Sequence, residues 1–135
     1  MLLDLYTARG ESLTGTPWNV YPRPQMKRSS YINLNGEWEF SAENPVYDQK
    51  ILVPFCPESM LSGIKKHFGE GVALWYRKNV RLPEGFNRGR VLLHIGAADQ
   101  MADIYVNGKH VYLDKAEGTY THKGGYTAFR YDVTD

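Results

Sequence analysis

The sequence predicts an all-β fold with mostly antiparallel strands, arranged as a β-sandwich or barrel. Short runs of alternating apolar and polar residues recur along the chain, with turn-forming residues between them, and no long window has a helical period. The pair Asn107-Gly108 lies between two such runs. This is a strong hairpin signal, because a type I′ turn needs positive φ at both central residues.

The first 30 residues predict an extended N-terminal strap rather than a helix. Thr16-Pro17 and Tyr21-Pro22-Arg23-Pro24 favour extended backbone, because proline fixes its own φ and biases the preceding residue away from the helix. We interpret residues 1–30 as a strap that lies over the surface of a single domain covering residues 1–135.

Alternation and turn signals predict about six or seven short strands, where a closed jelly roll needs about eight. A loop over residues 54–71 is the longest irregular stretch. Long loops inside a compact domain are often functional. We expect the strands at 37–40, 51–53, 74–82, 91–95, 104–106, 110–113 and 127–131.

Composition excludes several functional classes. Sixteen basic and fifteen acidic residues give a net charge of +1, which provides no footprint for nucleic acid or an anionic membrane. No apolar stretch approaches the roughly 18 residues that cross a bilayer. The N-terminus lacks the basic region of a signal peptide, so we expect a cytoplasmic location. Cys56, the single cysteine, excludes an internal disulfide and is expected to be a half-buried free thiol.

No residue pattern predicts a catalytic, metal or cofactor site. Asp99 and Asp103 would lie roughly 13 Å apart on one strand, farther than the carboxyl pairs of glycosidases. The four histidines lack the spacing of a metal site, and no serine has the Gly-x-Ser-x-Gly context of a nucleophile. The chain also has no phosphate-binding or dinucleotide-binding motif.

The segment from His122 to Tyr126 is the most promising loop. His122 precedes Lys123-Gly124-Gly125-Tyr126 in what we expect to be an exposed loop, and loops carry function more often than strands do. The strand aromatics could stack on sugar rings, but packing in the core is the more common role of such residues.

Six different motifs follow one another from about residue 22 to the end of the chain. They are Leu34-Asn35-Gly36-x-Trp38-x-Phe40, residues 53–63, Trp75-Tyr76-Arg77 with Leu82-Pro83, residues 90–97, Tyr105-Val106-Asn107-Gly108, and residues 122–134. Together they resemble the N-terminal domain of the family 2 glycoside hydrolases. That family contains bacterial β-galactosidases, β-glucuronidases and β-mannosidases.

The resemblance implies an antiparallel jelly-roll β-sandwich of the galactose-binding-domain type. In the family this sugar-binding domain accompanies an immunoglobulin-like domain and a catalytic (β/α)8 barrel, and it continues with at least one more strand. We therefore expect a jelly roll that lacks its last strand or strands, in a fragment of a larger enzyme. The signatures of the barrel's two catalytic glutamates are absent from this chain.

The resemblance also implies candidate carbohydrate contacts, because loops of this domain help to wall the active-site mouth in relatives. The corresponding loops are 54–63 and 120–126, and the candidates on them are Glu58, His122, Lys123 and Tyr126.

The leading functional prediction is a non-catalytic, sugar-binding or scaffold domain of a retaining, β-galactosidase-like or β-glucuronidase-like enzyme, inactive alone and without a cofactor. Its expected partners are a carbohydrate, through the parent enzyme, the remaining parent domains and a second copy of the chain. Two alternatives stay open: an independent carbohydrate-binding module and a structural oligomerisation domain.

Overall fold

The computed structural model describes residues 6–21 and 23–134. The remaining residues include Pro22 of the expected strap and Asp135 of the last motif, which therefore lie outside the described residues. The described chain falls into two compact units, divided between Arg81 and Leu82, and each unit is described by itself.

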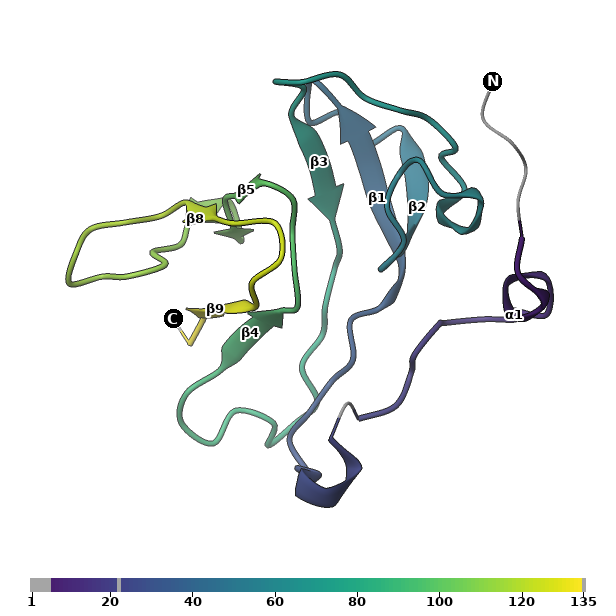
Figure 1. Cartoon of the computed structure of the whole chain (residues 1–135). Helices are drawn as coiled ribbons and strands as arrows, with labels where there is room; N and C mark the ends of the chain where they lie inside the picture. The colour runs from purple at the N-terminus through teal and green to yellow at the C-terminus, as the bar shows by residue number, and fades with distance from the viewer. Residues whose placement is uncertain (1–5, 22, 135) are drawn as a thin grey trace. The chain divides into compact units, whose positions relative to one another are not determined.

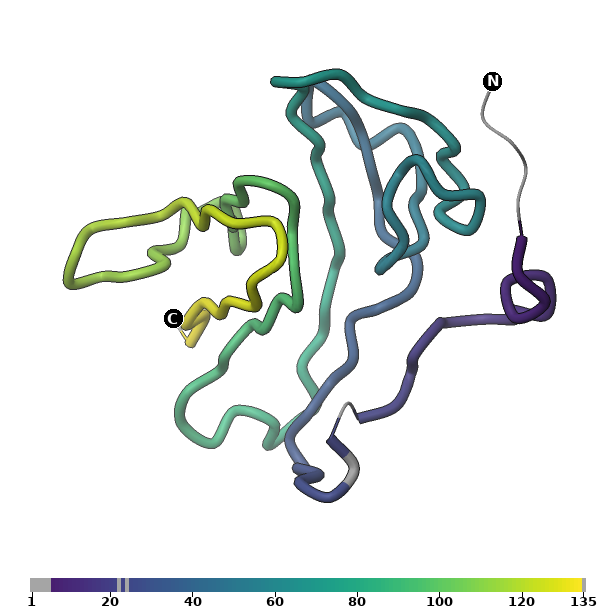
Figure 2. The backbone as a smooth tube through the Cα atoms, in the orientation of Figure 1, coloured from purple at the N-terminus to yellow at the C-terminus, as the bar shows by residue number. Residues whose placement is uncertain are grey.

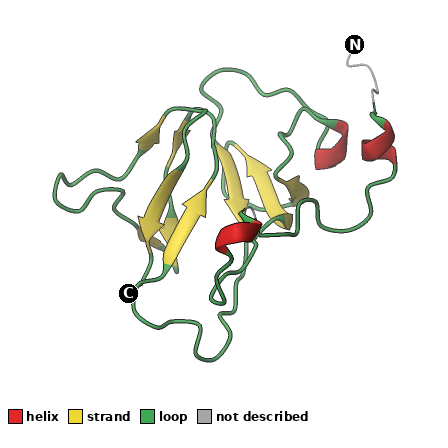
Figure 3. Ribbon diagram, turned by 60° about the horizontal axis from the view of Figure 1, so that its bottom comes forward, coloured by secondary structure: helices red, strands yellow, loops and turns green. Residues whose placement is uncertain are grey.

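The secondary structure is almost entirely β, and every strand pairing is antiparallel (Figures 1 and 3). The predicted all-β, antiparallel class is thereby confirmed, whereas the jelly-roll arrangement stays a prediction. The strands are β1 Gly36–Ala42, β2 Gln49–Val53, β3 Leu74–Arg77, β4 Leu92–Ile95, β5 Met101–Ala102, β6 Tyr105–Val106, β7 Lys109–His110, β8 His122–Lys123 and β9 Phe129–Asp132. The short helices are α1 Ala8–Glu11, η1 Pro24–Met26 and η2 Met60–Ser62.

The first unit contains one sheet of order β2-β1-β3. Phe40 of β1 and Ile51 of β2 are 0% and 1% exposed and form the core of this unit. Burial of such side chains contributes about 1.5–3 kcal/mol each. Tyr76 lies opposite Phe40 in the register, and their rings meet edge to face at a centroid distance of 5.2 Å.

Strand β3 is shorter than the alternating pattern predicted: it ends at Arg77 and not at residue 82. Val80 and Leu82 are 44% and 43% exposed. Alternation marks a strand only where a neighbouring strand accepts its backbone hydrogen bonds. Among the described residues, none pairs with this continuation.

The strap contains one helical turn that the sequence reading did not expect. Thr7 supplies the N-cap of α1, since its Oγ1 accepts a hydrogen bond of 3.1 Å from the Gly10 amide. The rest of the described strap is irregular except for η1, as the trace in Figure 2 shows. Trp18 of the strap contacts Phe55 at a centroid distance of 5.6 Å.

The second unit contains three two-stranded ladders, β4-β9, β5-β8 and β6-β7. Its core is formed by Phe129 and Tyr131 of β9, which are 9% and 0% exposed. The hairpin predicted at Asn107-Gly108 is confirmed: these residues join β6 to β7 with φ of 50° and 79°. Local turn chemistry therefore determined this element.

Candidate functional site

His122 begins the β8–β9 connection and is buried, with 9% of its surface exposed. The expectation that it lies in an exposed loop is wrong, because it pairs with Ala102 in the β5-β8 ladder. Its ring stacks on Phe129 at 3.8 Å between centroids. Its Nε2 lies 3.0 Å from the Gly124 carbonyl oxygen. A carbonyl only accepts hydrogen bonds, so Nε2 donates, and this hydrogen bond holds the start of the β8–β9 connection against His122.

The two glycines after Lys123 make the connection tight. Gly124 has φ of +127°, a conformation that favours glycine. A Cβ on Gly125 would collide with the side chain of Asp99. A larger residue at this position therefore requires the Asp99 side chain or the turn to move.

Lys123 and Tyr126 project from this connection into solvent. Lys123 is exposed although it pairs with Met101 in the β5-β8 ladder. Tyr126 is 100% exposed. An exposed tyrosine presents an apolar ring face and a hydroxyl, and an ammonium group presents three hydrogen-bond donors. This pair offers the groups that a sugar ring and its hydroxyls or carboxylate can contact.

Glu58 lies in the first unit, on a loop that internal hydrogen bonds hold in place. The Ser59 hydroxyl caps η2 by accepting a 3.2 Å hydrogen bond from the Ser62 amide. The buried Ser62 hydroxyl lies 3.1 Å from the Pro57 carbonyl oxygen and accepts a 3.0 Å hydrogen bond from the Ile64 amide. Among the described residues, the ion-pair partner of Glu58 is His67 of the same loop, whose Nδ1 lies 3.8 Å from Glu58 Oε1.

Tyr76 is a neighbour of Glu58 that the sequence reading assigned only to the general pool of aromatic residues. Although Tyr76 is 39% exposed overall, desolvation of its phenol raises the pKa to about 12, and the negative charges of Glu58 and Cys56 add to this rise. Cys56 itself is exposed and not half-buried as expected.

The structure therefore brings three of the four predicted contacts together. One short stretch of the second unit contains His122 and Lys123 of β8 and Tyr126 of the following turn, and His122 is the buried member. Glu58 belongs to the first unit and stands as a separate candidate.

A stack of four aromatic rings, which the sequence reading missed, covers the β6-β7 hairpin. Tyr105 stacks on His110 at 4.5 Å, His110 on Tyr120 at 4.3 Å, and Tyr120 on Tyr112 at 4.0 Å between centroids. The cross-strand pair Tyr105–His110 could have been expected from the hairpin register. Tyr112 belongs to the expected strand at 110–113 but follows the end of β7. Tyr120 lies farther along the chain, where the sequence carried no pairing signal.

Asp103 joins this stack to the start of the β8 segment. Its Oδ1 lies 3.1 Å from His110 Nε2 and accepts a 2.7 Å hydrogen bond from the Thr121 hydroxyl. An acceptor already engaged by two partners is suited to fixing a hairpin and poorly suited to acid–base chemistry. We therefore assign Asp103 a structural role.

The described part of the chain offers neither a metal cluster nor a membrane-spanning helix. Its histidine, cysteine, aspartate and glutamate side chains form no cluster of three or more that could hold a metal ion. Its helices are all too short and too polar to cross a bilayer.

Known proteins share sequence with most of this chain. A β-glucuronidase of Chlorocebus aethiops is 37% identical over 139 residues, which cover 86% of this chain and 20% of that protein. The β-glucuronidase of Homo sapiens is 29% identical with the same coverage. These matches confirm the predicted resemblance to the family 2 glycosidases. A β-galactosidase of Thermoanaerobacter pseudethanolicus adds 36% identity over 61 residues, which cover 45% of this chain and 7% of that protein.

The glycosidase relationship concerns only part of each relative. The chain spans about a fifth of the length of the curated β-glucuronidases it matches. No family model matches the chain. The relationship is therefore inferred from the similarity to the curated glycosidases. The aligned region includes residues of both units, because it covers 86% of the chain and neither unit alone is that large.

Proposed function

We propose that this chain is a non-catalytic accessory domain of a retaining glycoside hydrolase of the β-glucuronidase or β-galactosidase type. One observation carries the proposal: the similarity to a β-glucuronidase runs over 86% of this chain but over only 20% of that protein. A segment of this size can shape one side of a substrate site while other domains supply the chemistry.

The carboxylates of the described residues support a non-catalytic role. A retaining glycosidase needs two carboxyl groups about 5–5.5 Å apart, one as acid and one as nucleophile. Glu58 faces His67, and Asp103 is engaged by His110 and Thr121. Both carboxylates are engaged by histidine or hydroxyl partners, and we assign the reaction to other domains of the parent enzyme.

In this proposal the β8–β9 connection contacts the carbohydrate. Tyr126 stacks on the sugar ring, Lys123 donates to a hydroxyl or carboxylate, and the buried His122 positions both without touching the ligand. Glu58 accepts hydrogen bonds from sugar hydroxyls at a second contact. Support comes from the full exposure of Tyr126 and from the close approach of Gly125 to Asp99, which fixes the backbone next to it.

A chimera tests this assignment. Residues 6–134 replace the matching region of the Chlorocebus aethiops β-glucuronidase, and kcat/KM for an aryl glucuronide is compared among Tyr126 variants. We expect Tyr126→Ala to lower kcat/KM about tenfold, equivalent to ~1.4 kcal/mol, and Tyr126→Phe to keep most of it, since the ring stays. A folded, active chimera that tolerates Tyr126→Ala unchanged would refute the contact.

The second candidate function is an independent carbohydrate-binding module. The complete exposure of Tyr126 favours it, because a solitary ring can hold a sugar without other domains. Titration of the isolated chain with methyl galactoside, glucuronide and mannoside separates the two candidates. Shifts of the Lys123 to Tyr126 amide signals favour the module, and silence of these signals favours the accessory domain.

The proposed partners are the carbohydrate, the remaining domains of the parent enzyme and a second copy of this chain. Strands β2 and β3 are the edges of the first sheet and leave backbone groups for another strand. Light scattering that gives the monomer mass at high concentration would argue against self-association. The cytoplasmic location stays a prediction.

A further inference from the structure

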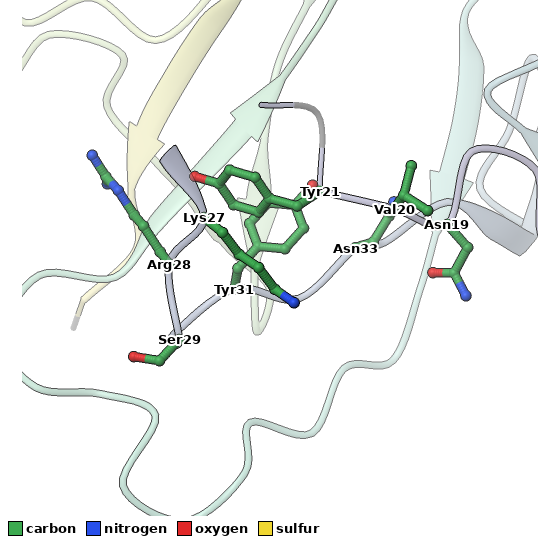
Figure 4. Close-up of a pocket in the computed structure, with 8 residues that line it drawn as sticks. All are labelled: Asn19, Val20, Tyr21, Lys27, Arg28, Ser29, Tyr31 and Asn33. Carbon is green, nitrogen blue, oxygen red and sulfur yellow. The ribbon is translucent and has the colours of Figure 1, made fainter. Parts of the chain in front are cut away.

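A hollow of about 590 Å³ lies where the strap folds back on itself in the first unit (Figure 4). Its volume falls in the range of small-molecule sites, about 300–1,000 Å³. Two short segments line it, on either side of η1. Neither segment has a part in the proposed function described above.

The frame of this hollow is fixed by hydrogen bonds between the two segments. Asn33 Nδ2 donates to the Trp18 carbonyl at 2.8 Å, and Asn33 Oδ1 accepts from the Asn35 amide at 2.8 Å. Asn35 Nδ2 donates to the Pro17 carbonyl at 3.3 Å. The amide side chain of Asn33 is thus used by the frame and not free for a ligand. The two walls are held together by Asn33, which lines the hollow, and by Asn35, which does not.

Aromatic rings form the centre of the hollow. Tyr21 and Tyr31 meet edge to face, with centroids 4.6 Å apart and an interplanar angle of 71°. Figure 4 shows these rings at the centre of the lining residues. Tyr31 is 41% exposed, so part of its ring faces solvent and can take an apolar C–H face.

The charge of the hollow is positive. Lys27 and Arg28 line it and are exposed, and none of the described lining residues is acidic. Among the described residues, the ion pairs involve other side chains and leave both cations without a carboxylate partner. Asn19 and Ser29 add neutral groups that can donate to or accept from hydroxyls.

We propose that this hollow is a binding site for a carboxylated saccharide. A tyrosine ring takes the apolar face of a sugar, and the Asn19 amide and the Ser29 hydroxyl take its hydroxyl groups. Lys27 or Arg28, whose side chains extend in different directions from neighbouring positions (Figure 4), takes its carboxylate through charge-assisted hydrogen bonds. A neutral sugar would leave both cations unused, and a simple anion would leave the rings unused. The combination of groups therefore favours a uronate over either one.

The test is a titration of the ¹⁵N-labelled 135-residue chain, followed by NMR, with methyl β-D-glucuronide, methyl β-D-glucoside and acetate. We expect the glucuronide to shift amide signals of residues 19–33 and to bind about tenfold more tightly than the glucoside, or ~1.4 kcal/mol. Equal binding of the two sugars, or no shift in residues 19–33, would overturn the proposal. Acetate binding as tight as that of the glucuronide would reduce the hollow to a general anion site and also overturn it.

Matched variants assign the effect to the hollow. The pair Lys27→Gln and Arg28→Gln should weaken glucuronide binding about tenfold, and Lys109→Gln with Lys115→Gln, which removes the same charge elsewhere, should not. If both double variants weaken binding equally, only the net charge matters and the site is refuted. Signals of residues 122–126 report separately on the proposed function, so either proposal can fail alone.

Discussion

At the scale of single residues, close contacts of Gly125 and His122 restrain the β8–β9 connection. Gly125 passes beside the Asp99 side chain, and the buried His122 is fixed by its stack on Phe129 and by the Gly124 carbonyl. These contacts leave Lys123 and Tyr126 as the groups free to meet a ligand.

Gly125→Ala should therefore destabilise the chain. The added methyl group forces the Asp99 side chain or the turn to move, and overpacking of this kind costs about 1–3 kcal/mol. Gly96→Ala is the matched control, because a Cβ there meets nothing within 4 Å. Denaturant unfolding measures both changes, and equal effects would mean that the approach to Asp99 is not restrictive.

Tyr76 should make the chain sensitive to alkali. Burial raises its pKa from the usual 10.0 to about 12, so the folded state keeps a proton that the unfolded state releases within this range. Stability is fully present below pH 10 and falls as the pH rises toward 12. Tyr76→Phe should remove this loss, whereas Tyr126→Phe, at an exposed ring, should not. Urea unfolding on both sides of this window is the measurement, and an unchanged slope in Tyr76→Phe would contradict it.

At the scale of elements, the first sheet carries ion pairs on the face away from Phe40. Arg77 of β3 donates to both carboxylate oxygens of Glu39 in β1, at 2.7 and 3.0 Å. These hydrogen bonds from Arg77 are the main reason why the pKa of Glu39 is lowered. The β1-β3 ladder thus has an electrostatic component that depends on pH.

Acid should weaken this ladder. A carboxylate whose pKa is lower in the folded state adds stability above its unfolded pKa, and this stability is lost as the pH falls below about 4.5 and through the folded value. Glu39→Gln should lose part of the acid sensitivity and Glu70→Gln, at an exposed loop position, should retain it. The measurement is the unfolding midpoint between neutral and acidic pH, and identical profiles of the two variants would contradict the assignment.

Elements also separate what the sequence could predict from what it could not. The Asn107-Gly108 hairpin was predictable, because its turn conformation depends on two adjacent residues. The length of β3 was not, since alternation does not say whether a partner strand continues. His122 was misplaced for a related reason: its pairing with Ala102 spans twenty residues of sequence, and the adjacent glycines suggested only a loop.

Among the candidate contacts too, those that depend on adjacent residues could be predicted, and those that depend on distant partners could not. Tyr126 could be predicted as a loop aromatic from the glycines before it, and it is fully exposed. Tyr76 was overlooked as a neighbour of Glu58, because the two residues come from a strand and a distant loop. The ring stack was overlooked because Tyr120, which joins His110 to Tyr112, comes from a later segment of the chain.

At the scale of the whole molecule, the chain consists of two compact units and resembles glycosidases along most of its length. Glu37, Glu39 and Asp132 are engaged in ion pairs with cationic side chains, and Lys123 and Tyr126 are exposed.

The most direct test of the non-catalytic account is hydrolysis of p-nitrophenyl β-D-glucuronide and p-nitrophenyl β-D-galactoside by the purified chain. The account predicts no release of nitrophenol above the rate in buffer, because two carboxyl groups at catalytic spacing are required. Turnover that copurifies with the chain and disappears in Glu58→Gln would contradict it, since that residue would then be a catalytic acid or nucleophile.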